Sequence, residues 1–368
     1  MGFMNTLDKK YQELLQDILD TGVTKMDRTG TGTLSVFGRQ IRHKMSEGFP
    51  LLTTKKMAWK TMVTELLWFL RGDTNIKYLV DNDCHIWDGD CFANYVRNFT
   101  KYVDSLPEDS ETEFIINKDK FINKIKTDDE FVKKWGNLGK IYGAQWRSWR
   151  VGKGIETTLK TEDGETIYEA GSIYIDQITK LINDLKTNPD SRRMMVNSWN
   201  VGELDTMVLP PCHYGFQCYT RELSLEERYE LMKKLDNWVS VHYKEPKTME
   251  YMDSQNIPNR AISLMYNCRS QDVPLGTPFN VSSYALLLEI IAKMVNMVSD
   301  ELIANMGDCH IYLNQIDGVK EQLTREPYPL PTVKISDRVV SDVSEYTLDD
   351  IVLENYQSHP SIKVPLSN

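Results

Sequence analysis

The stretch LPPCHYGFQCY, Leu209–Tyr219, is the segment around which the fold and the chemistry of this chain are organised. Two prolines precede Cys212, and His213 follows it directly. A thiol is strongly nucleophilic only as a thiolate, and nearby guanidinium groups lower its pKa. A cysteine in an apolar run is more often a small buried hydrophobe. The Cys-His pair alone therefore does not decide between a structural and a catalytic thiol.

Two flanking segments favour the catalytic interpretation. Upstream, the arginine pair Arg192-Arg193 lies in SRRMMVNSWN, and downstream Arg269–Asn280 reads RSQDVPLGTPFN. Soft sulfur adds readily to an electron-poor carbon and leaves again, while guanidinium groups bind phosphate oxygens in pairs. Together these segments predict a nucleophilic thiol that acts on a bound anion.

Composition limits the class of protein. The chain has 368 residues, of which 41% are hydrophobic and 26% charged, and a net charge of −10. These values are typical of a soluble globular protein, and the negative charge argues against broad nucleic-acid or membrane binding. Six cysteines without a CxxC motif predict reduced thiols and no metal site. The sequence has no run of 18 apolar residues that would predict a membrane span. We expect a cytoplasmic protein; the resemblance to a known family given below implies a bacterium or a virus-infected cell as its setting.

The N-terminal third contains three recognisable patterns. Apolar spacing predicts a helix over residues 7–21. The segment Asp27–Gly38, DRTGTGTLSVFG, predicts a hairpin turn, with LSVF beginning a strand and Arg28 placed to bind a phosphate. Residues 49–75 predict a strand, a turn and then a helix. On that helix one stripe comprises Ala58, Met62, Glu65 and Phe69.

Glu65 is thus a carboxylate on an apolar stripe. Burial raises the pKa of a carboxyl group, which suits a proton relay near neutral pH. The alternative is a side chain at the edge of the stripe that reaches solvent, and the sequence does not separate the two.

The rest of the chain alternates compact and polar segments. Trp87 offers an aromatic platform, and Asp163-Gly164 is a hairpin-turn signal. We expect a helix over residues 173–185, a strand starting at Ser191, a strand over AISLMYNCRSQD and a buried helix over residues 279–297. His310 and Tyr312 would share one face of a strand. We predict a single domain, 1–368, with polar inserts near 92–135, 151–171 and 222–260, the first and third helical.

The chain resembles the folate-dependent, cysteine-nucleophile thymidylate synthase family, which includes deoxynucleotide hydroxymethylases. The resemblance covers nearly the whole chain apart from the inserts. The segments that carry it are DRTGTGTLSVFG, FPLLTTKK, ELLWFLRGDTNI, IWD, LGKIYGAQWRSW, DSRRMMV, SWNVGELDTM, LPPCH, RSQDVPLGTPFN, GDCHIY and REPYPLPT.

The resemblance implies an α+β fold with a large twisted mixed sheet and flanking helices, in a homodimer formed by the backs of two sheets. It also implies that Cys212 adds to C6 of dUMP and that C5 then takes the methylene group of 5,10-methylenetetrahydrofolate as co-substrate. The products would be dTMP and dihydrofolate.

The resemblance also assigns the site residues. Arginines and Ser270 would hold the 5′-phosphate, with Arg192 and Arg193 donated across the dimer interface. Asn280 would contact O4 and N3 of the pyrimidine, while Glu65 and Tyr142 would manage protons. The implied catalytic residues are Cys212, Glu65, Tyr142 and Asn280. The implied dUMP-binding residues are Arg28, Arg192, Arg193, His213, Arg269, Ser270, Asp272, Asn280, His310 and Tyr312. The implied folate-binding residues are Lys55, Ile86, Trp87, Asp272, Leu275, Gly276 and Phe279.

Three departures from the family pattern keep an alternative product open. The sequence ends in Ser367 and Asn368 where members carry an apolar dipeptide, Asp90 stands where many members have tryptophan, and Cys268 stands where glutamine is common. A polar lid would admit water to the exocyclic methylene intermediate. The alternative function is therefore a dUMP 5-hydroxymethylase that releases tetrahydrofolate.

Two further classes remain as hypotheses. An acyl-transfer cysteine hydrolase would need a histidine base oriented by Asp or Asn, and it has no use for clustered arginines. A non-catalytic nucleotide- or RNA-binding relative would have lost the nucleophile or the arginines, and both are present.

Overall fold

The computed structural model describes residues 5–27, 29–107, 114–160, 166–235 and 246–366. Its contacts divide the chain into two compact units. The first unit comprises Met1–Ala58, Leu181–Met195 and Gly215–Asn368, and the second comprises Trp59–Lys180 and Val196–Tyr214. The expectation of a single domain stays a prediction.

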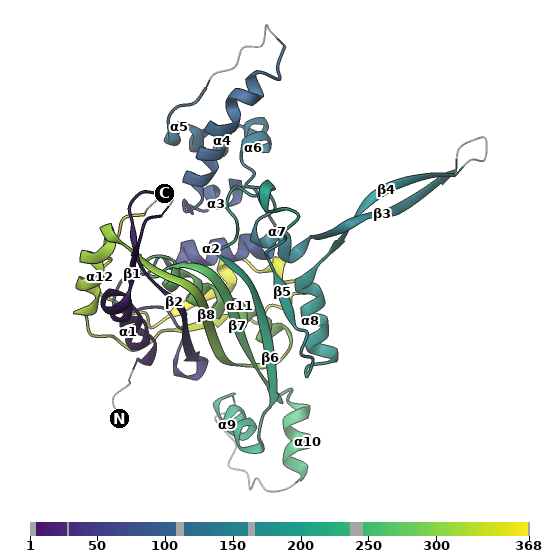
Figure 1. Ribbon diagram of the computed structural model, residues 1–368. Coiled ribbons are helices and arrows are strands. Elements are labelled where there is room, and N and C mark those ends of the chain that lie inside the picture. Colours follow the sequence, from purple (N-terminus) through teal and green to yellow (C-terminus); the bar gives the residue numbers. More distant parts are fainter. Residues whose placement is uncertain (1–4, 28, 108–113, 161–165, 236–245, 367–368) are drawn as a thin grey trace. The chain divides into compact units, whose positions relative to one another are not determined.

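A six-stranded sheet has the order β1-β2-β8-β7-β6-β5 (Figure 1). Its strands β1 and β2 are antiparallel, as are β2 and β8, whereas β7 and β8 are parallel, so the sheet is mixed. The predicted α+β class with a large mixed sheet is confirmed. The strands are β1 Val23–Lys25, β2 Thr33–Lys44, β5 Met195–Asn197, β6 His213–Glu222, β7 Arg260–Asp272 and β8 Val298–Tyr312.

In the first unit, the helix α11 (Gly276–Met294) packs against β7 and β8 and is buried on nearly all sides. The predicted buried helix is confirmed, but it starts and ends three residues earlier than expected. It ends before Asn296, whose φ of 52° is left-handed and stops the helix. The other elements of this unit are α1 Thr6–Thr21, α9 Leu225–Leu235, α10 Pro246–Ser254, α12 Ile316–Leu323, β9 Thr332–Ile335 and β10 Ile351–Glu354.

The predicted hairpin turn lies between β1 and β2. Asp27 organises it, because its carboxylate accepts hydrogen bonds from the backbone N–H groups of Thr29 at 2.8 Å and Gly32 at 2.9 Å. The Thr29 side chain, followed by these two backbone hydrogen bonds, lowers the pKa of Asp27 to about 2. Gly30 and Gly32 have φ of 74° and 79°, which glycine adopts without strain.

The strand predicted at the start of residues 49–75 is wrong. Residues 49–58 have no regular structure, and the backbone N–H groups of Thr53 and Thr54 bind a side chain instead of a neighbouring strand. The buried carboxylate of Asp8 accepts the N–H groups of Thr53 and Thr54 at 3.1 and 3.0 Å. The helix that follows begins at Trp59, so Ala58 precedes it and is exposed, whereas Met62 and Phe69 are buried as predicted.

The second unit contains the first two polar inserts. The first insert is helical, as predicted, and it buries an aromatic cluster whose centre is Tyr95 at 0% exposure. The rings of Phe121 and Trp135 lie 5.1 and 4.9 Å from that of Tyr95. The elements of this unit are α2 Trp59–Leu70, α3 Lys77–Asp81, α4 Asp88–Val103, α5 Lys118–Thr127, α6 Asp129–Trp135, α7 Tyr142–Arg147, β3 Trp149–Lys160 and β4 Thr166–Ile175.

The second insert is the antiparallel pair β3–β4, and its predicted turn at Asp163-Gly164 lies outside the described residues. The helix expected over 173–185 is α8, Gln177–Thr187. Residues 173–175 belong instead to β4, and Asp176 accepts the Thr179 N–H at 2.9 Å as an N-cap. The strand expected from Ser191 shrinks to β5, with Arg192 and Arg193 in the preceding turn.

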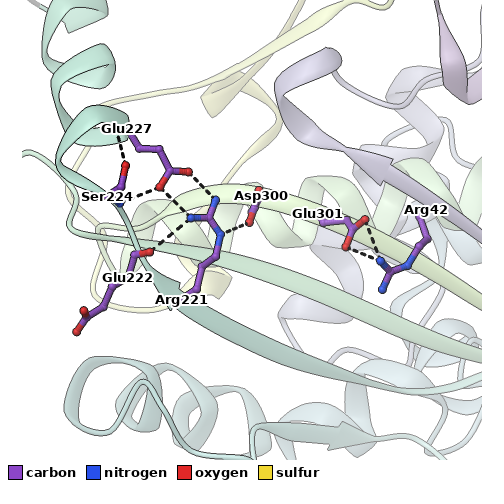
Figure 2. Close-up of polar contacts among 7 residues, drawn as sticks. All are labelled: Arg42, Arg221, Glu222, Ser224, Glu227, Asp300 and Glu301. Carbon is purple, nitrogen blue, oxygen red and sulfur yellow. Dashed lines mark hydrogen bonds and ion pairs between the residues drawn. The ribbon is translucent and has the colours of Figure 1, made fainter.

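The third insert is helical as predicted, and an ion-pair network attaches it to the sheet (Figure 2). Arg221 on β6 donates to Asp300 on β8 at 2.8 Å and to both carboxylate oxygens of Glu227 at 2.9 and 3.0 Å. Glu227 also accepts the Ser224 N–H at 2.8 Å, which caps α9. These hydrogen bonds, that of Arg221 first, lower the pKa of Glu227. Arg221 thereby connects the start of the third insert to strands β6 and β8.

Candidate active site

Cys212 lies at the start of β6, and it is the one cysteine of the chain's six that is not buried. Its backbone N–H donates to the hydroxyl of Tyr142 at 2.9 Å. Tyr142 begins α7, is 3% exposed and has a φ of 21°. A positive φ at a residue with a large side chain is an unusual conformation that clusters at functional sites. The sequence motif LPPCH is thus anchored to the motif KIYGAQW.

His213 stacks on the ring of Tyr142, with ring centroids 4.1 Å apart and planes inclined by 22°. Phe69 of α2 completes this group, at 4.9 Å from Tyr142 and 6.2 Å from His213. Burial lowers the pKa of His213 to about 3. The imidazole is therefore neutral at physiological pH, where it can donate or accept a hydrogen bond but carries no charge.

Glu65 and Trp87 form the other side of this group. The indole Nε1–H of Trp87 donates to Glu65 Oε1 at 2.8 Å, and its ring lies 6.1 Å from that of Tyr142 in an edge-on arrangement. Desolvation raises the pKa of Glu65 to about 7, and the Trp87 hydrogen bond partly opposes that rise. The expectation that Glu65 titrates near neutral pH is therefore consistent with its surroundings, although its side chain is half-buried.

The raised pKa predicts a pH-dependent cost to folding. Between pH 4.5 and about 7, Glu65 keeps its proton in the folded state but loses it in the unfolded state, where its pKa has the ordinary value of 4.5. Stability therefore falls as pH rises from about 4.5 to 7. We expect Glu65→Gln to raise the free energy of unfolding by about 2–3 kcal/mol at pH 8 and to change it little at pH 4.

Urea unfolding of both proteins at a series of pH values measures this difference. Glu13→Gln, at an exposed position of α1, is the control and should show the wild-type pH dependence. A Glu65→Gln gain that is the same at pH 4 and pH 8 would contradict the assigned cause.

In the first unit, Asp272 ends β7 and is held on both carboxylate oxygens. It accepts from the Leu275 N–H at 3.0 Å and from Gln315 Nε2 at 3.1 Å. Burial raises its pKa. Lys55 is 6% exposed and donates to the carbonyl of Pro274 at 2.5 Å. Burial lowers the pKa of Lys55 to about 8, against the opposing charge of Asp272.

Asn280 lies near the start of α11, where its Nδ2 donates to Gln271 Oε1 at 3.2 Å. Leu275, Gly276 and Phe279 precede it and are half-buried. The loop after β7 and the first turns of α11 therefore bring together a carboxylate, a carboxamide and apolar side chains.

His310 and Tyr312 lie on β8 as predicted, with ring centroids 5.2 Å apart. His310 Nδ1 is 3.1 Å from Asp308 Oδ1, which also accepts from the Ser35 hydroxyl at 2.8 Å. Asp308 thus orients the imidazole from the same strand, and its carboxylate is held in turn by Ser35 of β2. The motif GDCHIY contains Asp308, but the position of its carboxylate depends on the hydrogen bond from Ser35 on the neighbouring strand β2.

The predicted phosphate-binding residues are mostly accessible. Arg192, Arg193 and Arg269 are exposed, and Ser270 is half-buried, with its carbonyl accepting from the Cys268 thiol at 3.1 Å. Among the described residues, neither guanidinium of the Arg192-Arg193 pair has a carboxylate partner. Arg28, like Ser367 and Asn368, lies outside the described residues.

The structure therefore gathers the predicted residues into two groups, one in each unit. Cys212, His213, Tyr142, Trp87 and Glu65 are connected by contacts within the second unit, and Ile86 beside them is 40% exposed. Four residues that contact predicted site residues were not themselves predicted as site residues from the sequence: Phe69, Asp308, Gln315 and Gln271. The described residues contain no group of three His, Cys, Asp or Glu side chains placed to hold a metal ion. They also contain no helix long and apolar enough to cross a bilayer.

Comparison with known proteins gives a consistent result. The sequence model of the family described as thymidylate synthase matches residues 9–368. A thymidylate synthase of Mesoplasma florum is 39% identical over 355 residues, which cover 96% of this chain and 98% of that protein. A thymidylate synthase of Listeria monocytogenes serovar 1/2a is 38% identical over 369 residues, which cover 98% and 99%.

A partly exposed cysteine that is linked through Tyr142 and Trp87 to a carboxyl group with a pKa of about 7 suits the chemistry of a covalent transferase. The chain belongs to the thymidylate synthase family. Members of this family are one-carbon transferases that act on dUMP, with 5,10-methylenetetrahydrofolate as co-substrate. The resemblance noted from the sequence is confirmed.

Proposed function

We propose that this chain converts dUMP to dTMP by reductive methylation, with Cys212 as the nucleophile. The observation that carries the proposal is the exposure of Cys212 among six cysteines of which the other five are buried. The backbone N–H of Cys212 donates a hydrogen bond to the Tyr142 hydroxyl, which fixes the position from which the Cys212 side chain extends. The folate co-substrate supplies the methylene carbon and the hydride.

In the proposed reaction the Cys212 sulfur forms a bond to C6 of dUMP, and the C5–C6 π electrons move toward C5 and O4. C5 becomes a nucleophile. The hydrogen on C5 must later leave as a proton, and the sulfur must depart from C6. Glu65, whose pKa is about 7, is suited to exchange protons through water at this stage, together with Tyr142. The neutral His213 contributes a hydrogen bond to this group and no charge.

We assign dUMP recognition to side chains with matching chemistry. Asn280 offers both a donor and an acceptor, which fits O4 and N3–H of uracil. His310, oriented by Asp308, and Tyr312 suit the ribose 3′-hydroxyl. The phosphate would be bound by Arg28, Arg192, Arg193, Arg269 and Ser270.

The folate is assigned to residues whose surroundings fit an aromatic, partly polar molecule. Trp87 and Phe279 offer aromatic faces, and Asp272 offers a half-buried carboxyl group with a raised pKa that can pair with ring nitrogens. Lys55 would be attracted to the acidic tail of a folate. The remaining residues of this set are Ile86, Leu275 and Gly276.

We also propose a homodimer in which Arg192 and Arg193 reach the phosphate bound by the partner subunit. Both are exposed, and among the described residues no carboxylate neutralises them. The two units would form one catalytic domain with three inserts, since the family match is continuous over residues 9–368. The enzyme would act in the cytoplasm, where Cys212 stays reduced, and it would require no nucleic acid.

The shared site predicts complementation between two inactive variants. Arg193→Ala subunits lack one phosphate contact, and Cys212→Ser subunits lack the nucleophile. After subunit exchange, about half of the dimers in a 1:1 mixture are mixed, and each mixed dimer has one complete site out of two. The mixture should therefore recover about a quarter of the activity of the same amount of wild-type protein. Dimers of each variant alone are the controls. An inactive mixture with exchange verified by mass spectrometry would show that each site belongs to one chain.

The decisive experiment on the function is mass analysis of the product from dUMP and 5,10-methylenetetrahydrofolate. We expect dTMP, with release of dihydrofolate followed by its absorbance. The alternative product, 5-hydroxymethyl-dUMP, would leave tetrahydrofolate and no such absorbance change. Relatives named thymidylate synthase match nearly the full chain, and no observation favours the hydroxymethylase.

A further inference from the structure

We infer that Gln271 is a positioning residue for the carboxamide of Asn280 and thereby sets the preference for uracil over cytosine. The inference rests on the proposed contact between Asn280 and the pyrimidine. Gln271 is the penultimate residue of β7 and is 1% exposed. Its Oε1 accepts a hydrogen bond from Asn280 Nδ2 at 3.2 Å.

The Gln271 side chain extends from β7, where its backbone is opposite Cys309 of β8, to the start of α11, where it contacts Asn280. Gly276, the first residue of α11, lies beside the amide, and a Cβ at that position would be 2.9 Å from Gln271 Nε2. A larger residue at position 276 would therefore have to displace the amide that contacts Asn280.

This position matters because a carboxamide has nearly the same shape after a half-turn, while its donor and acceptor change places. To bind uracil, Asn280 must direct Nδ2–H at O4 and Oδ1 at N3–H. After a half-turn, the same side chain offers an acceptor to a 4-amino group and a donor to an unprotonated N3. That is the pattern of cytosine. Asn280 alone therefore does not distinguish the two bases.

Gln271 removes this ambiguity. Asn280 Nδ2 carries two hydrogens, and the bond to Gln271 uses one and leaves the other for O4. A half-turn of Asn280 would place its Oδ1 against Gln271 Oε1, so that two acceptors would face each other in a buried place without a hydrogen bond. The cytosine-binding arrangement would require both amides to turn together.

The test compares the dissociation constants of dUMP and dCMP for folded variants. Gln271→Leu keeps the approximate size of the side chain and removes the acceptor. We expect it to weaken dUMP binding, strengthen dCMP binding and lower the preference for dUMP about tenfold, the effect of roughly one hydrogen bond. Gln271→Glu keeps an oxygen acceptor in either protonation state and should preserve the wild-type preference.

A second buried glutamine provides the matched control. Gln322 is 1% exposed and donates to Thr54 Oγ1 at 3.0 Å. Gln322→Leu should lower the melting temperature and leave the dUMP/dCMP preference unchanged. If Gln271→Leu does not fold, Gln271→Met replaces it, because it also lacks the acceptor and is more flexible.

The outcomes separate this inference from the function on which it rests. A folded Gln271→Leu or Gln271→Met with the wild-type preference overturns the role of Gln271, as does a Gln271→Glu variant that loses the preference. Asn280→Asp is measured in parallel. If that variant shifts the preference and Gln271→Leu does not, the inference alone is wrong. If Asn280→Asp shifts nothing, the proposed contact of Asn280 with the base is wrong.

Discussion

Cys212→Ser should reduce the turnover of dUMP by on the order of 10⁴-fold or more, because removing the nucleophile of a covalent mechanism removes the reaction path itself. A serine hydroxyl is almost fully protonated at neutral pH and adds poorly to C6. The substitution is nearly isosteric, and the anchor of this position is its backbone N–H. We therefore expect dUMP to bind with nearly unchanged affinity.

Two measurements check this expectation: calorimetric binding of dUMP, and release of the C5 hydrogen of labelled dUMP into solvent. Cys218→Ser is the control, because Cys218 lies on the same strand but is 1% exposed and has no proposed contact with the substrate. It should lose stability and keep turnover. Cys212→Ser activity within tenfold of wild type would contradict covalent addition by this residue.

Much of the fold was predictable because its elements are specified by local sequence. The spacing of α1, the apolar character of α11 and the turn residues of the β1–β2 hairpin each reflect one physical rule. The errors arose where a distant group intervened. Residues 49–58 have strand-like composition, but Asp8 accepts the N–H groups of Thr53 and Thr54. Residues 173–175 continue a helical pattern, but they pair with β3.

The site was predictable to a different extent. Its residue types could be named from motifs, yet most of its interactions join motifs far apart in the chain. The pKa of Glu65 depends on burial and on Trp87, and the carboxylate of Asp308 that contacts His310 is held by Ser35 of β2. Gln271 was overlooked because a buried glutamine in a strand has no sequence signature. It becomes informative only when its amide is seen to accept from Asn280.

Asn280→Asp should change the preference between dUMP and dCMP by on the order of 10³-fold, because a site that pairs a specific polar edge rejects a mismatched one. A carboxylate has no hydrogen to give to O4 of uracil and faces it with repulsion. It accepts the 4-amino hydrogens of cytosine instead. The ratio of kcat/KM for the two nucleotides, with Kd for each, measures the change.

The same substitution also affects the neighbour of Asn280. In the wild type, Gln271 Oε1 accepts from Asn280 Nδ2. In Asn280→Asp, two oxygens would face each other, so the Gln271 amide must turn and donate through Nε2. We therefore expect Asn280→Asp combined with Gln271→Leu to bind dCMP less tightly than Asn280→Asp alone, because Leu cannot donate to the carboxylate. Equal dCMP affinity in the single and double variants would show that the two side chains act independently.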